Sequence, residues 1–112
     1  MSVLPEAPWG DATTAHGLRG DQMVLTIVYG DLDATALYCA VTDPAGVDHV
    51  TRVERTLLIL GTSVYSTSYP RDFPDANQLQ PGRYSVSWQK VRPGGEPGEE
   101  IGVDAFEIPP RG

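Results

Sequence analysis

The chain has 112 residues, a length that suits a single domain. Its net charge is −7, from 15 acidic and 8 basic residues, which argues against nucleic-acid binding because phosphate contacts need clustered lysine and arginine. Cys39 is the single cysteine, so an internal disulfide is excluded. The first residues lack the basic and apolar regions of a signal peptide, and no segment approaches the ~20 apolar residues of a membrane span. We therefore expect synthesis in a cytoplasm and no membrane contact.

Residues 1–20 are predicted to form an extended N-terminal arm. Prolines and glycines are spread along this segment and are expected to interrupt any regular element. Yet Val3, Leu4 and Trp9 are apolar, which a purely solvated tail does not need. Two interpretations are open: the arm packs on its own domain, or it reaches a neighbouring subunit. We favour the second, and predict that these three side chains bind a partner.

Seven segments that follow the arm are predicted as strands, with turn signals about every ten residues and no helix. Such spacing is typical of a β-sandwich or barrel. The predicted strands are 22–29, 35–42, 47–54, 56–60, 62–69, 83–91 and 101–108. The side chains predicted to be buried between two sheets are Leu37, Cys39, Val41, Tyr84, Val86, Trp88, Phe106 and Ile108.

Two neighbouring predicted strands differ in composition. Segment 56–60 is a continuous apolar run, which indicates a buried strand, although periodicity alone does not exclude a helical turn. Segment 62–69 is rich in serine, threonine and tyrosine and is predicted to have a polar outer side. We predict that Tyr65, Tyr69 and the loop residue Phe73 form an exposed aromatic platform for a partner.

The stretch 79–88 reads Leu-x-Pro-Gly-x-Tyr-x-Val-x-Trp, a turn that leads into an alternating strand. Pro81 sets φ for a tight turn, and Gly82 can adopt the positive φ that follows. Tyr84, Val86 and Trp88 then share one side of the strand. This pattern resembles the tyrosine corner and following strand of immunoglobulin-like and fibronectin type III-like sandwiches.

The resemblance extends from the first predicted strand to residue 108. Its other pieces are the Asp-Pro-Ala-Gly turn at 43–46, the loop that starts at Tyr69-Pro70 and the closing segment 104–108. Together they resemble immunoglobulin-like sandwiches of bacterial and bacteriophage structural proteins. The resemblance implies an all-β fold, with a single immunoglobulin-like antiparallel β-sandwich of about seven strands over residues 21–108 and a Pro-rich tail at 109–112.

The same resemblance implies a non-catalytic structural protein of a virion. Bacteriophage capsid decoration is the leading role that we expect, followed by other head- or tail-associated roles. The partners would be protein subunits of the capsid or tail, and a homo-oligomer on the particle is compatible with such a role. The protein would be found in the virion after synthesis in the host cytoplasm.

The residues give no reason to expect catalysis. His16 and His49 are the two histidines of the chain, and both are interpreted as exposed polar side chains. Asp48 lies on the opposite side of its strand from His49, so the two do not form a dyad. No Gly-x-Ser-x-Gly elbow occurs. We predict no catalytic residue.

Pairs of aspartates raise the alternative of a calcium site, which needs about six to eight oxygens that converge on one point. No loop resembles an EF-hand, and the same aspartates fit as turn formers. We therefore predict neither a metal nor a cofactor. The pairs are Asp31 and Asp33, Asp43 and Asp48, and Asp72 and Asp75.

Two other functions stay open. A carbohydrate- or cell-surface-binding immunoglobulin-like module would use the aromatic platform predicted above. An intracellular adaptor or inhibitor would instead use its acidity towards a basic partner.

Overall fold

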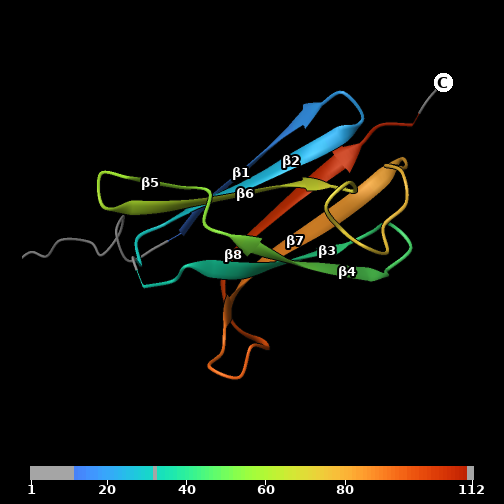
Figure 1. Cartoon of the computed structure of the whole chain (residues 1–112). Helices are drawn as coiled ribbons and strands as arrows, with labels where there is room; N and C mark the ends of the chain where they lie inside the picture. Colours follow the sequence, from blue (N-terminus) through green and yellow to red (C-terminus); the bar gives the residue numbers. More distant parts are fainter. Residues whose placement is uncertain (1–11, 32, 111–112) are drawn as a thin grey trace, which may run out of the picture.

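A computed structural model of the protein describes residues 12–31 and 33–110. The chain forms two antiparallel sheets of four strands, sheet A in the order β1-β2-β6-β5 and sheet B in the order β4-β3-β7-β8. This arrangement confirms the all-β class and a β-sandwich (Figure 1). Within those residues, no helix is long and apolar enough to cross a membrane. The strands are β1 (Ala12–Arg19), β2 (Gln22–Tyr29), β3 (Ala36–Thr42), β4 (Asp48–Glu54), β5 (Leu57–Ile59), β6 (Thr62–Tyr69), β7 (Gly82–Val91) and β8 (Pro97–Ile108).

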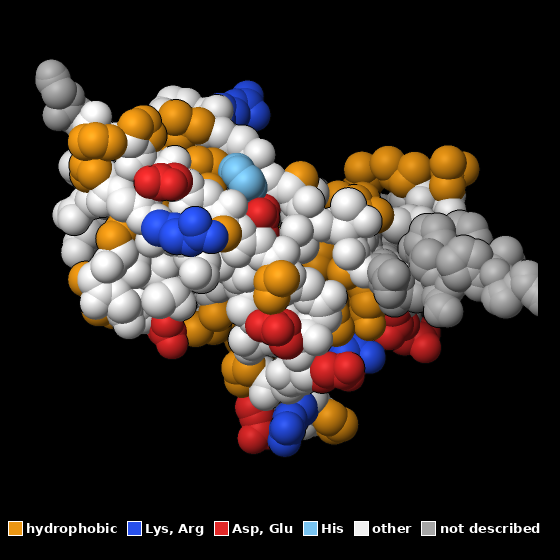
Figure 2. Space-filling model, turned by 180° about the vertical axis from the view of Figure 1, so that it is seen from behind, with side chains coloured by type: hydrophobic (Ala, Val, Ile, Leu, Met, Phe, Trp, Pro, Cys, Tyr) orange, Lys and Arg blue, Asp and Glu red, His pale blue; other side chains and the backbone are white. Residues whose placement is uncertain are grey.

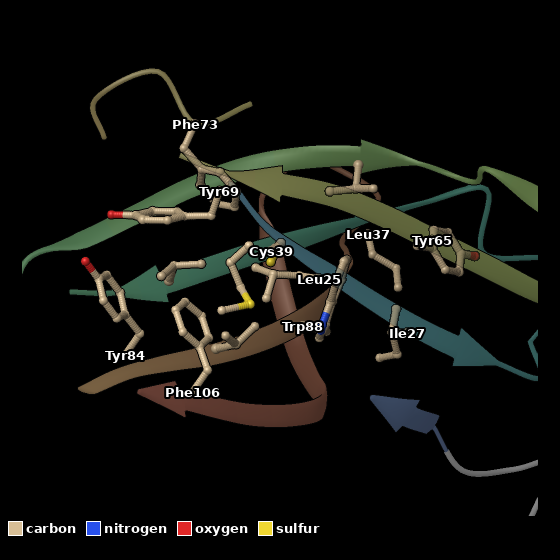
Figure 3. Close-up of a cluster of buried hydrophobic side chains, with 14 of the residues drawn as sticks. Leu25, Ile27, Leu37, Cys39, Tyr65, Tyr69, Phe73, Tyr84, Trp88 and Phe106 are labelled. Atoms are coloured by element: carbon tan, nitrogen blue, oxygen red, sulfur yellow. The ribbon is translucent and has the colours of Figure 1, made fainter. Parts of the chain in front are cut away.

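The core lies between the two sheets, because alternate residues of the inner strands β2, β3, β6 and β7 point inward (Figure 3). Trp88 is at its centre with no exposed surface. The predicted core side chains are buried, except Ile108, which is partly buried at the end of β8. Cys39 is fully buried, and burial raises the pKa of its thiol, so the thiol stays protonated. The prediction that Cys39 is buried between the two sheets is confirmed.

The turn before β7 forms as the sequence predicts. The Tyr84 hydroxyl accepts a hydrogen bond from the Gln80 backbone N–H at 2.8 Å and donates to the Gln80 carbonyl at 3.2 Å. Gly82 has φ 132°, and a Cβ there would approach the Pro44 ring to 2.7 Å. Pro81 is exposed, so its role is to shape the turn rather than to pack. Tyr84 then stacks on Phe106 with ring centroids 4.7 Å apart.

The described part of the expected N-terminal arm is an integral strand, which corrects the prediction that no regular element forms before residue 20. β1 pairs with β2 along its whole length. It also contacts β8, where Thr14 Oγ1 donates to the Val103 carbonyl at 2.8 Å and His16 Nδ1 lies 2.8 Å from Asp104 Oδ2. Gly17 does not break the strand, because at a sheet edge the lost side-chain packing is small. Val3, Leu4 and Trp9 lie outside the described residues.

The β7–β8 hairpin projects away from the two sheets (Figure 1). Irregularities in register at Trp88/Gln89 and Gln89/Val91 bend it. β8 starts at Pro97, four residues before the predicted start at Ile101. The Tyr38 hydroxyl donates to the Gly95 carbonyl at 2.6 Å and ties the hairpin tip to the outer face of β3.

Candidate functional site: an apolar sheet edge

Four consecutive apolar side chains are exposed at one end of sheet A. Leu57, Leu58 and Ile59 of β5 are 48, 51 and 46 % exposed, and Leu60 in the following turn is 97 % exposed. We call residues 57–60 the apolar edge. The run does form a strand, but the expectation that it is buried is wrong, because β5 is the outermost strand of its sheet.

The register shows that the apolar edge presents side chains to both faces of the sheet. Leu57 pairs with Val64, and Leu58 pairs with Ser63. Directly opposite residues share a face, so successive residues of β5 point to opposite sides. No described strand pairs with the outer side of β5. Its outer backbone groups are therefore free to pair with another chain.

Leu60 adopts a backbone conformation that leucine rarely takes. Its φ is 52° and that of Gly61 is 75°, and these two residues connect β5 to β6. Positive φ at both central residues is typical of the type I′ hairpin turn, in which asparagine followed by glycine is preferred. Leucine there is strained by its side chain and is also almost fully exposed. Neither property stabilises the isolated fold.

Hydrophobic side chains gather at this end of the molecule. In Figure 2 they form a group at the right-hand end, which carries the β5–β6 turn. Single exposed apolar residues elsewhere are normal, whereas a contiguous group marks an interaction site. Among the described residues, the other large apolar side chains that are exposed are Leu18, Val28, Val47, Val50 and Val103, which belong to other strands and turns.

The predicted aromatic platform does not exist, because its three residues are buried. Tyr65, Tyr69 and Phe73 are 0, 2 and 2 % exposed. The Tyr65 hydroxyl donates to the Ala34 carbonyl. Tyr69 packs edge-on against Phe73, with centroids 5.1 Å apart, and burial raises the pKa of Tyr69 to about 12. The carbohydrate-binding alternative thereby loses the residues on which it depended.

His49 is a buried side chain, not the exposed one expected from its position. It is 6 % exposed, and its Nε2 lies 2.9 Å from Asp43 Oδ2. The hydrogen bond with His49 and those from the Val47 and Ala45 N–H groups hold the pKa of Asp43 below its usual range. Asp48 points elsewhere and accepts from Thr42 Oγ1 at 2.7 Å. The histidine therefore fastens the β3–β4 turn.

The second histidine, His16, is exposed, which confirms the expectation from the sequence. Its side chain is 36 % exposed and pairs with Asp104 of β8, as described above. Its ring also lies 5.8 Å from that of Phe106. This pair links the outer strand of sheet A to the outer strand of sheet B. Its evident role is to close one side of the sandwich.

The aspartates considered for calcium act as turn formers where the structure gives them partners. Asp31 accepts from the Asp33 N–H at 2.9 Å, and Asp72 accepts from the Ser68 N–H at 2.9 Å. In the part of the chain that is described, no group of three or more histidine, cysteine or acidic side chains is placed to hold a metal ion.

Comparison with known proteins gave no match to a family model, a curated protein or a solved structure.

Proposed function

We propose that this protein is a non-catalytic structural subunit that attaches to other protein subunits through its apolar edge. The observation that carries this proposal is the exposure of four consecutive apolar side chains on the outermost strand of sheet A. An exposed sheet edge offers unpaired backbone groups, and the apolar side chains add a driving force for burial. A partner strand or groove satisfies both.

Burial of the apolar edge by a partner contributes a favourable free energy to attachment. Complete burial of a leucine or isoleucine side chain is worth about 1.5–3 kcal/mol, so completing the burial of a half-exposed one contributes about 1 kcal/mol. The total free energy gained by burying residues 57–60 is partly offset by the loss of translational and rotational freedom on association. Attachment is therefore strengthened further when many copies bind one surface.

We further propose that the sandwich is immunoglobulin-like. Two observations support this. In chain order, the sheet orders β1-β2-β6-β5 and β4-β3-β7-β8 correspond to strands A-B-E-D and C′-C-F-G of immunoglobulin-like domains. The Tyr84 hydroxyl bonded to the backbone of Gln80 corresponds to a tyrosine corner.

The assembly that we propose is a virion, with decoration of a bacteriophage capsid as the specific role. The resemblance of the sequence to virion sandwiches supports this choice, and the apolar edge supplies a surface for attachment. The protein would be made in the host cytoplasm and bind the particle there, without nucleic acid or membrane as a partner.

Co-sedimentation with purified particles tests the proposal. The natural chain should sediment with the particles, and replacement of Leu57 and Ile59 by serine should weaken sedimentation several-fold. Val50→Ser is the matched control, because Val50 is 43 % exposed on β4, the outermost strand of sheet B. Failure of the natural chain to sediment overturns the virion assignment, and equal losses in both variants overturn the assignment of the apolar edge.

A further inference from the structure

A small pocket lies at the end of the sandwich opposite the apolar edge. Its walls come from the β3–β4 turn, the end of β6, the loop 70–81 and the start of β7. Tyr69 ends β6, whereas the apolar edge adjoins the start of that strand, so the length of β6 separates the two features. In Figure 1 the β3–β4 turn and the loop 70–81 lie on the right, and the β5–β6 turn lies on the left.

Tyr69 brings a buried side chain with an unpartnered hydroxyl group to this pocket. The side chain is 2 % exposed, because its ring packs edge-on against Phe73 and Tyr84. Among the described residues, nothing forms a hydrogen bond with the Tyr69 hydroxyl, whereas the hydroxyls of Tyr65 and Tyr84 each donate to a backbone carbonyl. Figure 3 shows the hydroxyl groups of Tyr69 and Tyr84 on the same side of the core. Buried polar groups normally have a partner, so an unpartnered hydroxyl that lines a pocket indicates a ligand.

Asp43 brings a negative charge to the same pocket. Among the described residues that line the pocket, it is the only charged one. Its Oδ1 accepts from the N–H groups of Ala45 and Val47, and its Oδ2 lies 2.9 Å from His49 Nε2. A carboxylate oxygen has two lone pairs, so Oδ2 keeps one for a further donor. The Asp43 side chain is 21 % exposed, and its lowered pKa keeps it ionised at neutral pH.

The composition of the pocket favours a cationic ligand with an apolar stem. Ammonium and guanidinium groups carry only donors, and both Asp43 Oδ2 and the Tyr69 hydroxyl can accept. A charged donor offsets the cost of covering an ionised carboxylate better than a neutral donor does. Val47 is 52 % exposed at the rim, beside Pro44, and the two can pack against methylene groups. The net charge of −7 also attracts cations.

The size of the pocket limits the ligand to about one amino-acid side chain. An enclosed cavity of about 150 Å³ holds one benzene molecule, and this pocket has a volume of about 260 Å³. We propose that the pocket binds the cationic end of a lysine or arginine side chain of a partner protein, with Asp43 and the Tyr69 hydroxyl as acceptors. Such binding does not depend on the attachment proposed above, because the pocket and the apolar edge lie at opposite ends of β6.

Titration of the isolated, full-length protein with capped amino acids tests this site. The probes are N-acetyl-arginine amide and N-acetyl-lysine amide, and the amide signals of residues 43–47 in two-dimensional NMR spectra report binding. We expect half-saturation at concentrations on the order of millimolar, as suits a single side chain, and the tighter of the two probes identifies the preferred cation. N-acetyl-citrulline amide has the shape of the arginine probe without its charge and should bind about tenfold more weakly.

Two variants with matched controls locate the probe. Tyr69→Phe removes only the hydroxyl and should weaken binding several-fold, whereas Tyr65→Phe, at the other end of β6, should not. Asp43→Asn removes the charge and should abolish the difference between the arginine and citrulline probes. Asp48→Asn, in the same hairpin, should preserve that difference, because Asp48 bonds to Thr42 instead. Tyr69→Phe is the decisive variant, because it leaves the hydrogen bonds of the β3–β4 turn unchanged.

The other outcomes overturn the proposal. Equal binding of the arginine and citrulline probes shows that the pocket does not select a charge. Binding that Tyr69→Phe leaves unchanged, or signal changes confined to residues outside 43–47 and 77–84, places the probe elsewhere on the acidic surface. The absence of signal changes with both basic probes, at concentrations well above millimolar, shows that the pocket binds neither.

Discussion

β5 and β6 are adjacent strands of one sheet, and their compositions predict the reverse of their burial. β5 consists of Leu57, Leu58 and Ile59, and each is about half exposed. β6 is rich in hydroxyl-bearing residues, yet five of its eight side chains are buried. The buried side chains of β6 are Ser63, Tyr65, Thr67, Ser68 and Tyr69. Position within the sheet, rather than residue type, decides which strand is covered.

The two strands differ in how their side chains are satisfied. β6 is an inner strand, so its polar groups must find partners inside the protein, and they do: Thr67 Oγ1 donates to Asp72 Oδ2 at 3.1 Å. β5 is an outermost strand, and the apolar surface that it leaves in water is what a binding partner can bury. Inner strand β6 places its side chains in the core, whereas outermost strand β5 leaves apolar surface in water, which the proposed partner would bury.

The largest expected effect comes from removing a ring from β6. Tyr65→Ala should lower the free energy of unfolding by about 3–5 kcal/mol, because a fully buried aromatic side chain is replaced by a cavity. Chemical denaturation followed by circular dichroism measures this. Leu58→Ala on β5 is the matched control and should change stability by no more than about 0.5 kcal/mol. Equal losses in the two variants would show that β5 is as much part of the core as β6.

A smaller effect is expected from a buried hydroxyl of the same strand. Thr67 is 6 % exposed, and its bond to Asp72 is lost in Thr67→Val at nearly constant volume. The expected loss of unfolding free energy is about 1 kcal/mol, the usual contribution of such a hydrogen bond. The same substitution at Thr62, at the partly exposed start of β6, is the control. An unchanged or raised stability in Thr67→Val would mean that the buried hydroxyl is dispensable.

The sequence predicts the buried side of some strands but does not predict the difference in burial between β5 and β6. Alternation alone predicts the inward side of β2, β3 and β7, because in these strands apolar residues occupy every second position. In β6 both sides carry polar residues, so Tyr65 and Tyr69 give no sign of their direction. The exposure of β5 depends on the order of strands in sheet A, which joins β2 to β6 across the sequence. That order is a property of the whole chain, and no local pattern contains it.

The exposure of the apolar edge could not be predicted from the sequence either. The run 56–60 is visible in the sequence, but an apolar run is normally evidence for burial. A signal that was present is Leu60-Gly61, since glycine after a short strand indicates a hairpin turn and leucine then occupies a position of positive φ. The partner of His49 was missed because Asp43 lies six residues away in the chain and is brought near only by the turn.

A pH effect of at most about 1 kcal/mol is expected where β6 ends. Burial disfavours the charged form of Asp72, but hydrogen bonds from the Ser68 N–H, Arg71 and Thr67 outweigh it and hold the pKa of Asp72 below its usual range. A lowered folded-state pKa stabilises the protein above the unfolded value of about 3.9, and this contribution is lost as pH falls through the folded value. The effect is small because the Asp72 side chain is 38 % exposed and solvent screens it.

Thermal midpoints measured between about pH 5 and pH 2 test this effect. The natural chain should lose more stability over that interval than Asp72→Asn does. Asp75→Asn, in the same loop, is the control and should follow the natural chain. Parallel curves for the natural chain and Asp72→Asn would contradict the assignment.

The smallest expected change in stability is also the one that separates stability from function most sharply. Leu60 has φ 52° and is 97 % exposed, so the isolated fold gains nothing from leucine there. Asparagine tolerates this backbone conformation better, and Leu60→Asn should therefore raise the free energy of unfolding by about 0.5 kcal/mol.

The same variant removes the most exposed apolar side chain of the apolar edge, so its binding to a partner should be weaker than that of the natural chain. Val50→Asn is the control, in which neither the gain in stability nor the loss of partner binding should appear. A variant that is both more stable and equally well bound would show that Leu60 has no role in attachment. A variant that is less stable would show that the leucine side chain stabilises the isolated protein.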